Sequence, residues 1–344
     1  MSLRHTPTPL VRLHDAALVD LDGVIYRGPD VIAHAPESLA QARGAGMPIM
    51  FVTNNASREP GDVADQLTRL GVPAAPDEVM TSAQAAGALL AAELPEGSRV
   101  LVVGGVGLRT AVRDAGMRIV ETAADDPIAV VQGFSPDVGW RQLAEAAYAI
   151  QRGAWHLATN VDRTLPNEHG LAPGNGALVG AVVEATGRWP VSAGKPQPAV
   201  FRLAAERIGA ADPVVVGDRL DTDLAGARAA GYAGLHVFTG VHGVRDVLLA
   251  PPEHRPTYVG ADLRSLLEPH PAPVRAESGW WTVNRWAARV TRGALELRGP
   301  TSLTRCLPID LVRAACAASW TAADDGAGPD PAGLGDPTVC VPEP

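Results

Sequence analysis

Short apolar runs alternate with longer amphipathic stretches from Ala16 onward. ALVDLD is followed by PESLAQARGAG, and PIMFVTNN by GDVADQLTRLG. Apolar runs of about four to eight residues separated by helix-length segments are typical of βαβ units and a parallel sheet. Gly46 and Gly71 fit the ends of the two helices, because a left-handed residue at that position has no Cβ to clash. The sequence therefore predicts an α/β fold.

A second series of the same kind begins at about Ser98 with RVLVVGG, PIAVVQG and WHLAT, and it ends near Pro190. GKPQPAVFRLAAERIG and PVVVGD then resume the style of the first series. Only the outer pieces have candidate catalytic residues at strand ends, where open parallel sheets bind their ligands. We therefore expect a Rossmann-like, doubly wound core, formed by residues 1–82 and 193–270, with an α/β cap domain inserted as residues 83–192.

The pattern changes again after about Glu268. PHPAPVRAESG has the composition of a linker, WWTV, ARVT and ALELR are predicted short strands, and LPIDLVRAACAASW is a predicted helix. The last stretch, rich in Pro and Gly, is predicted to be irregular. Residues 271–344 should thus form a small α+β extension, comparable to a reduced acetyltransferase-like fragment without an identifiable acyl-CoA loop. We expect it to serve packing or regulation.

Composition restricts the partners of the 344-residue chain. Its net charge is −9 and no basic stripe rises above that balance, which argues against nucleic acid and favours a small-molecule partner. No apolar run approaches the ~20 residues that cross a bilayer, and the N-terminus lacks a secretory signal, so we expect a cytoplasmic protein without membrane insertion. Cys306, Cys316 and Cys340 lack CxxC spacing, so we expect neither a zinc site nor a disulfide but reduced, inert thiols.

The strongest local signal is Asp20-Leu21-Asp22-Gly23 at the end of an apolar run. Side chains alternate along a strand, so Asp20 and Asp22 would point the same way, roughly 6.6 Å apart. One carboxylate can attack while the other handles protons, if their surroundings separate their pKa values. Alone, the motif could equally be a turn, because Asp and Gly are turn formers.

Further polar residues follow other strand-like or turn segments. They are Thr53 and Asn54 after the second apolar run, Lys195 in AGKPQP, and Asp218, Asp221 and Asp223 in VVVGDRLDTD. Phosphoryl transfer needs an in-line nucleophile, cations near the equatorial oxygens and a proton donor for the leaving group. Asp20 and Asp218 would hold Mg²⁺, which prefers carboxylates and water. The Lys195 ammonium and the Thr53 hydroxyl would bind phosphate oxygens.

At these residues the chain resembles the haloacid-dehalogenase-like hydrolases. DLDGVIYRG, FVTNNAS, GKPQP and GDRLDTD match the four motifs of its NagD-like and 4-nitrophenyl-phosphatase-like branch, in which a large cap of the C2 type follows the second motif. TNVDRTLPNEHGLAPGNGALVGAVVEATG looks like the signature stretch of that cap. The match runs from about Leu13 to Leu267 and implies a Mg²⁺-dependent phosphatase.

The resemblance also implies roles for individual residues. Asp20 would be the nucleophile, and Asp22 the general acid and then the base that activates water. Thr53 and Lys195 would bind the phosphoryl group with help from Asn54, which could instead be structural. Asp20, the main-chain carbonyl of Asp22 and Asp218 would hold the metal, and Asp223 would support its waters. Asp221 would only cap the helix that follows.

Four polar residues of the cap stretch are candidates for contacting the rest of the substrate: Asn160, Asp162, Glu168 and His169. The core plus a short C-terminal extension resembles the actinobacterial glycerol-3-phosphate phosphatases. Glycerol 3-phosphate is therefore the expected substrate, with a role in glycerophospholipid recycling. 4-Nitrophenyl phosphate, a nucleotide, a sugar phosphate, phosphoglycolate and pyridoxal phosphate stay open as alternatives. Enzymes of this branch often pair through the cap, which leaves a homodimer open.

Two other classes of function compete with this prediction. Asp20 and Asp22 could be the carboxylate pair of an inverting glycosidase, which needs neither Lys195 nor a metal. The chain could also be a non-catalytic protein that binds a phosphorylated metabolite, although such a protein would have no use for Asp22.

Overall fold

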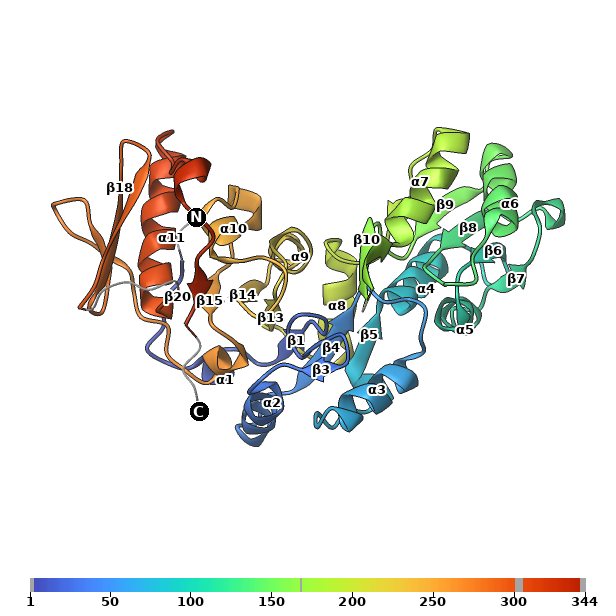
Figure 1. The fold of residues 1–344 in the computed structure, drawn as a ribbon. Helices are drawn as coiled ribbons and strands as arrows, with labels where there is room; N and C mark the ends of the chain where they lie inside the picture. The colour runs from blue at the N-terminus through green and yellow to red at the C-terminus, as the bar shows by residue number, and fades with distance from the viewer. Residues whose placement is uncertain (1–2, 168, 301–305, 341–344) are drawn as a thin grey trace. The chain divides into compact units, whose positions relative to one another are not determined.

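The computed structural model describes residues 3–167, 169–300 and 306–340. By its internal contacts the chain divides into two compact units, residues 1–50 with 205–344 and residues 51–204. Figure 1 shows the elements of both units. This division does not test the boundaries between cap and core that the sequence predicts, and they stay a prediction. Within the described residues, no helix combines the length and apolarity needed to cross a membrane.

The first unit contains a parallel sheet with the strand order β15-β14-β13-β1. Its strands are β1 (Ala17–Val19), β13 (Val214–Gly217), β14 (Ala233–Val237) and β15 (Tyr258–Gly260). Every residue of these strands is buried, as expected of a parallel sheet covered on both faces. Around it lie α1 (Leu10–Leu13), α2 (Ala35–Gly44), a π-helical turn (Leu220–Leu224), α9 (Ala225–Ala230) and α10 (Val244–Leu248). The α/β fold predicted from the sequence is confirmed.

A small hairpin follows β1. It pairs β2 (Tyr26–Arg27) with β3 (Asp30–Val31) in antiparallel register.

Gly46 lies just past the end of α2 at φ 90°, where the absence of Cβ relieves the left-handed backbone, as the sequence predicts.

The C-terminal part of the same unit is an antiparallel sheet with one long helix. The sheet has the order β16-β17-β18-β19, from β16 (Val274–Arg275) through β17 (Trp281–Val283) and β18 (Trp286–Thr291) to β19 (Ala294–Arg298). Helix α11 (Ile309–Asp324) contacts β17, β18 and α10. Its Trp320 is almost fully buried, and its indole N–H donates to the Val247 carbonyl at 2.8 Å. The predicted strands and helix are therefore present and share one apolar cluster with α10.

The expectation of reduced thiols is wrong for two of the three cysteines. Cys306 and Cys340 form a disulfide with a Cα–Cα distance of 4.9 Å. They come together because β20 (Cys306–Leu307) pairs with β21 (Thr338–Val339), which lies in the stretch predicted to be irregular. That pairing joins segments 34 residues apart, and no short-range spacing could signal it. Cys316 is free and buried on α11, and burial raises the pKa of its thiol.

The second unit contains β4 (Ile49–Thr53), which straddles the division and pairs in parallel with β5 (Val79–Thr81). It also contains a parallel sheet with the order β12-β9-β8-β6-β7. These strands are β6 (Arg99–Val103), β7 (Arg118–Val120), β8 (Ala129–Gln132), β9 (Trp155–Ala158) and β12 (Val191–Ser192). The hairpin of β10 (Thr164–Asn167) and β11 (Gly170–Pro173) follows β9.

Helices cover the five-stranded sheet in pairs. Helix α4 (Ser82–Glu93) packs against α5 (Val106–Asp114), and α6 (Trp140–Gln151) packs against α7 (Asn175–Thr186). The two pairs lie on opposite faces of the sheet (Figure 1). The remaining helices are α3 (Pro60–Arg69) and α8 (Pro198–Arg207), which crosses the division between the units.

Candidate active site

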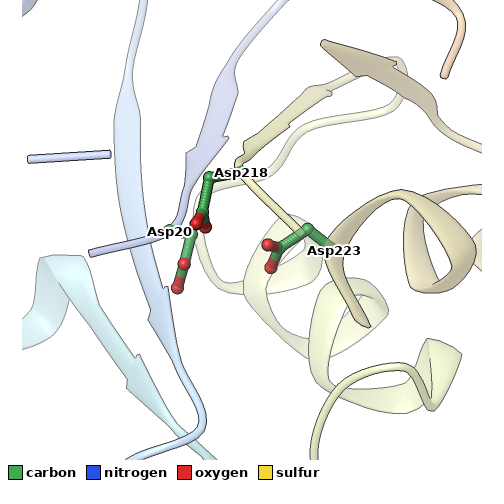
Figure 2. A group of neighbouring side chains, drawn as sticks. All are labelled: Asp20, Asp218 and Asp223. Atoms are coloured by element: carbon green, nitrogen blue, oxygen red, sulfur yellow. The ribbon is translucent and has the colours of Figure 1, made fainter. Parts of the chain in front are cut away.

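Three carboxylates come together at the carboxyl ends of two neighbouring strands. Asp20 follows β1, Asp218 follows β13, and Asp223 lies in the π-helical turn. One oxygen from each lies within 4.8 Å of the others. The register pairs Val19 with Val216, and the Asp20 N–H donates to the Val216 carbonyl at 2.9 Å. Asp20 and Asp218 therefore follow their strands within one residue of the same level. In Figure 2, Asp223 points from its helical segment toward the other two.

Asp218 is fully buried and is enclosed by two glycines. Its Oδ2 accepts the Val241 N–H at 2.6 Å. A Cβ on Gly240 would lie 1.8 Å from that oxygen, and a Cβ on Gly23, which has φ +84°, would lie 2.4 Å from it. No other residue type leaves room for this carboxylate at either position. The sequence motifs did not include the Thr239–Val241 loop, although its place directly after β14 is the same signal that points to Asp20 and Asp218.

The same loop also joins the β2–β3 hairpin. The Thr239 hydroxyl donates to the Gly23 carbonyl at 2.6 Å, and Arg27 Nη2 donates to the Thr239 carbonyl at 2.5 Å. The turn before the hairpin and the end of β2 are therefore both attached to the loop that encloses Asp218.

Asp223 is also buried, and its Oδ2 accepts the Arg219 N–H at 3.2 Å. A Cβ on Gly217 would lie 2.2 Å from Asp223 Cβ, so the glycine that ends β13 allows this side chain to approach. Asp221, two residues earlier, points elsewhere: its oxygens accept Arg219 Nε at 3.1 Å and Arg219 Nη2 at 2.9 Å.

The expected helix cap at Asp221 is wrong, because the π-helical turn moves the start of α9 to Ala225 and makes Leu224 the capping residue. Burial acts to raise the pKa of Asp221. The hydrogen bonds and charge of Arg219 outweigh it, and the net pKa is lowered. Asp221 is thus a charged partner of Arg219 and stands apart from the three-carboxylate group.

Asp22 is exposed in the turn before the β2–β3 hairpin. The Tyr26 hydroxyl donates to its Oδ2 at 3.4 Å, and the Gly23 N–H donates to the Tyr26 carbonyl at 2.8 Å. This surface position gives the Asp22 carboxyl access to water and a fixed neighbour on the hairpin.

The second unit brings together Asn54 and Lys195. Thr53 ends β4, is buried, and its hydroxyl oxygen accepts the Asn55 N–H at 3.1 Å. Asn54 Oδ1 accepts the Lys195 N–H at 2.8 Å, and its Nδ2 donates to the Lys195 carbonyl at 3.2 Å. Lys195 is 4% exposed, and its ammonium donates to the Val52 carbonyl at 3.1 Å.

Of the four cap candidates, two are part of the same network. Asn160 Nδ2 donates to the Asn54 carbonyl at 2.7 Å, and Asp162 Oδ2 accepts Asn54 Nδ2 at 2.9 Å. His169 is exposed in the turn between β10 and β11. Glu168 lies outside the described residues.

A divalent cation fits the three-carboxylate group. The donors are all carboxylate oxygens, which suit a hard cation such as Mg²⁺. The two glycines beside Asp218 hold one of those donors in a place that any Cβ would fill. Three carboxylates in this arrangement can hold such a cation, and the charge of the cation would then neutralise and orient a phosphate.

Two family models for hydrolases match the sequence. One, described as haloacid dehalogenase-like hydrolase, matches residues 17–118, and one, described as HAD-hydrolase-like, matches residues 192–266. A third, described as GCN5-related N-acetyltransferase like domain, matches residues 284–338, within the predicted extension. The chain belongs to the haloacid dehalogenase-like hydrolases, as the motifs suggest, and it is a phosphoric monoester hydrolase of that family.

Similar proteins define its branch. The chain is 47% identical, over 81% of its length and 78% of the relative's, to a D-glycerol 3-phosphate phosphatase of Mycobacterium tuberculosis. The crystal structure of a glycerol phosphate phosphatase of that organism in complex with magnesium has a TM-score of 0.82 at 44% identity, covering 91% of this chain and 92% of the other. A p-nitrophenyl phosphatase from Archaeoglobus fulgidus has a TM-score of 0.68 at 31% identity, covering 74% and 98%.

Proposed function

We propose that the chain hydrolyses glycerol 3-phosphate to glycerol and phosphate through a phosphoaspartate on Asp20. The observation that supports this best is the group of three carboxylates that gathers beside two adjacent strand ends. The choice of substrate rests on the similarity to the mycobacterial D-glycerol 3-phosphate phosphatase. That similarity spans 278 residues, more than the core and cap together, so it includes part of the extension.

In the proposed reaction an Asp20 oxygen forms a bond to phosphorus while the bond from phosphorus to the ester oxygen breaks. Asp22 gives its proton to the departing alkoxide and then takes one from the water that hydrolyses the phosphoaspartate. The exposed position of Asp22 suits a group that exchanges protons with water. Lys195 and Thr53 bind the phosphoryl oxygens, where the ammonium offsets negative charge that grows during attack.

Mg²⁺ is the proposed cofactor, held by Asp20, Asp218 and the Asp22 main-chain carbonyl, with Asp223 supporting its waters. When bound, it supplies positive charge that offsets the repulsion between the carboxylates and the phosphate. The all-oxygen donor set and the glycine enclosure of Asp218 support this assignment.

Three expectations of the sequence continue as proposals. His169, in an exposed hairpin turn, and Glu168 are candidates for meeting the glycerol part of the substrate. The chain forms homodimers through its cap. It acts in the cytoplasm.

The test is phosphate release from a panel of phosphate esters by the wild type and Asp20→Asn. The panel holds glycerol 3-phosphate, 4-nitrophenyl phosphate, a nucleotide, a sugar phosphate, phosphoglycolate and pyridoxal phosphate. We expect the highest kcat/KM for glycerol 3-phosphate, no turnover by Asp20→Asn, and loss of activity in EDTA that Mg²⁺ restores. Equal release by both proteins would refute the mechanism. A better substrate elsewhere in the panel would refute the choice of ester alone.

Membership of the phosphatase branch removes the glycosidase interpretation of Asp20 and Asp22. It also argues against a non-catalytic binding protein, since all four motifs are present.

A further inference from the structure

The Asn54 side chain binds both main-chain polar groups of Lys195. Its Oδ1 accepts the Lys195 N–H at 2.8 Å, and its Nδ2 donates to the Lys195 carbonyl at 3.2 Å. A side-chain amide has two N–H donors, and the second goes to Asp162 Oδ2 at 2.9 Å. Because the Lys195 N–H requires an acceptor, the network itself fixes which end of the amide is oxygen. Both donors of Asn54 are therefore used within the protein.

Asp162 lies at the other end of this contact, in the loop after β9. Its own N–H donates to Asn160 Oδ1 at 3.1 Å, and its carbonyl accepts the Gly176 N–H at 2.8 Å. Asn160 in turn donates to the Asn54 carbonyl at 2.7 Å. The loop is thus attached to Asn54 twice, once to the main-chain carbonyl of Asn54 and once to its side-chain amide.

This joint leaves little room for movement. A Cβ on Gly194 would lie 2.4 Å from the Thr159 carbonyl oxygen and 2.6 Å from Asn54 Oδ1. The Ser82 hydroxyl also donates to the Asn54 carbonyl, at 2.7 Å. Asn54 is consequently held from β4, α4, the loop after β9 and the Lys195 segment together.

We infer that Asp162 is a positioning residue for the phosphate site, acting through Asn54 on Lys195, and we name the Asn54–Asp162 hydrogen bond the latch. The Asp162 carboxylate orients the Asn54 amide, and that amide fixes the Lys195 backbone and thereby the position of the Lys195 ammonium. This replaces the sequence expectations that Asn54 contacts phosphate and that Asp162 contacts the leaving group. The inference rests on the proposed function, because it assumes that Lys195 binds the phosphoryl group.

The two roles differ in their dependence on the leaving group. A positioning residue affects every phosphate ester alike and also affects inorganic phosphate, whereas a leaving-group contact affects only the ester that has that group. Hydrogen bonds to charged groups typically contribute enough that their removal weakens binding about ten-fold or more. Asp162→Ala should therefore raise KM for glycerol 3-phosphate and for 4-nitrophenyl phosphate, and Ki for inorganic phosphate, by one common factor of about ten.

A conservative variant and a matched control complete the experiment. Asp162→Asn keeps a side-chain oxygen that can accept from Asn54, so it should recover most of the loss seen with Asp162→Ala. Asn54→Asp places two carboxylates next to each other and should weaken phosphate binding more than Asp162→Ala does. Asn54→Asp combined with Asp162→Asn restores a donor and acceptor pair and should bind phosphate more tightly than Asn54→Asp alone. Asp114→Asn, exposed on α5, is the control and should match the wild type.

Calorimetry of inorganic phosphate binding in the presence of Mg²⁺ separates this inference from the proposed function. If the wild type released no phosphate from any ester, the proposed function would fail, yet phosphate binding would still report on the latch. An unchanged phosphate Ki in a folded Asp162→Ala protein would overturn the inference. So would a loss confined to glycerol 3-phosphate. If Asp162→Ala does not fold, Asn54→Asp is compared with the double variant. A double variant that binds phosphate no better than Asn54→Asp would then overturn the inference.

Discussion

Gly240→Ala should disable the metal site although no acidic residue is substituted. The new Cβ would lie 1.8 Å from Asp218 Oδ2, 2.3 Å from Cγ and 2.6 Å from Cβ, so the methyl group meets the whole side chain. Real Cβ atoms essentially never approach other heavy atoms closer than 3.0 Å, so the oxygen must move by at least 3.0 − 1.8 = 1.2 Å. Asp218 is fully buried and accepts the Val241 N–H from the same loop, so it has no free volume to enter.

A shift of this size has a large expected effect. Misplacing a reacting or ligating group by about 1 Å can cost about 100-fold in rate, and changes to residues that orient metal ligands typically cost about 10–100-fold in affinity or activity. We therefore expect Gly240→Ala to lower kcat/KM by about 100-fold and to raise the Mg²⁺ concentration at half-maximal activity by about 10–100-fold.

The assay is a Mg²⁺ titration of phosphate release, with Mg²⁺ binding measured separately by calorimetry. Gly243→Ala is the matched control, since its Cβ would have no neighbour closer than 3.9 Å, and it should titrate like the wild type. A folded Gly240→Ala protein with wild-type Mg²⁺ dependence would refute the reasoning that Asp218 is a ligand held in place by the glycine.

Three further predictions concern stability. Burial lowers the pKa of His236 to about 3 and, with the charge of a neighbouring arginine, that of His270 to about 4. Below the unfolded value near 6.5 only the unfolded chain takes up these protons, so urea unfolding should show about 1.6 kcal/mol lost per histidine between pH 6.5 and pH 5. Replacing Cys306 and Cys340 by Ser opens a 34-residue loop and should lower the free energy of unfolding by about 3–4 kcal/mol, with kcat unchanged. Trp320→Ala should cost about 3–5 kcal/mol, because it leaves a cavity where α11 meets α10.

Each of these has a result that would contradict it. His270→Gln should flatten the acid dependence, and a curve identical to the wild type would show that His270 does not titrate as described. Wild-type protein whose unfolding is insensitive to a reductant would count against a stabilising disulfide. A Trp320→Ala protein of wild-type stability would show that the C-terminal helix contributes little to the core.

The core could be predicted from the sequence because its signals are local. Asp20 and Asp218 each follow an apolar run directly, and parallel strands bring their carboxyl ends to one edge, so the position of each acid along the chain is enough to pair them. The expected helix cap at Asp221 was wrong because the sequence does not signal the π-helical turn that moves the start of α9 to Ala225.

The parts that the sequence did not predict depend on long-range contacts. Gly240 has no distinctive local pattern, and its importance arises only from the Asp218 carboxylate beside it, 22 residues earlier. The latch joins Asn54 to Asp162 across 108 residues, and the disulfide joins two short strands, one of which lies in a segment rich in Pro and Gly. Residue type alone suggested a ligand contact for Asp162, whereas its hydrogen-bond partner indicates positioning.

The most direct test of the account is to find the phosphorylated residue during turnover. Labelled glycerol 3-phosphate is mixed with the Mg²⁺-loaded enzyme, quenched in acid within milliseconds and reduced with borohydride, and the modified peptide is sequenced by mass spectrometry. We expect the modification at Asp20, and only when Mg²⁺ is present. Modification of any other residue, or steady turnover with Asp20 never modified, would contradict it.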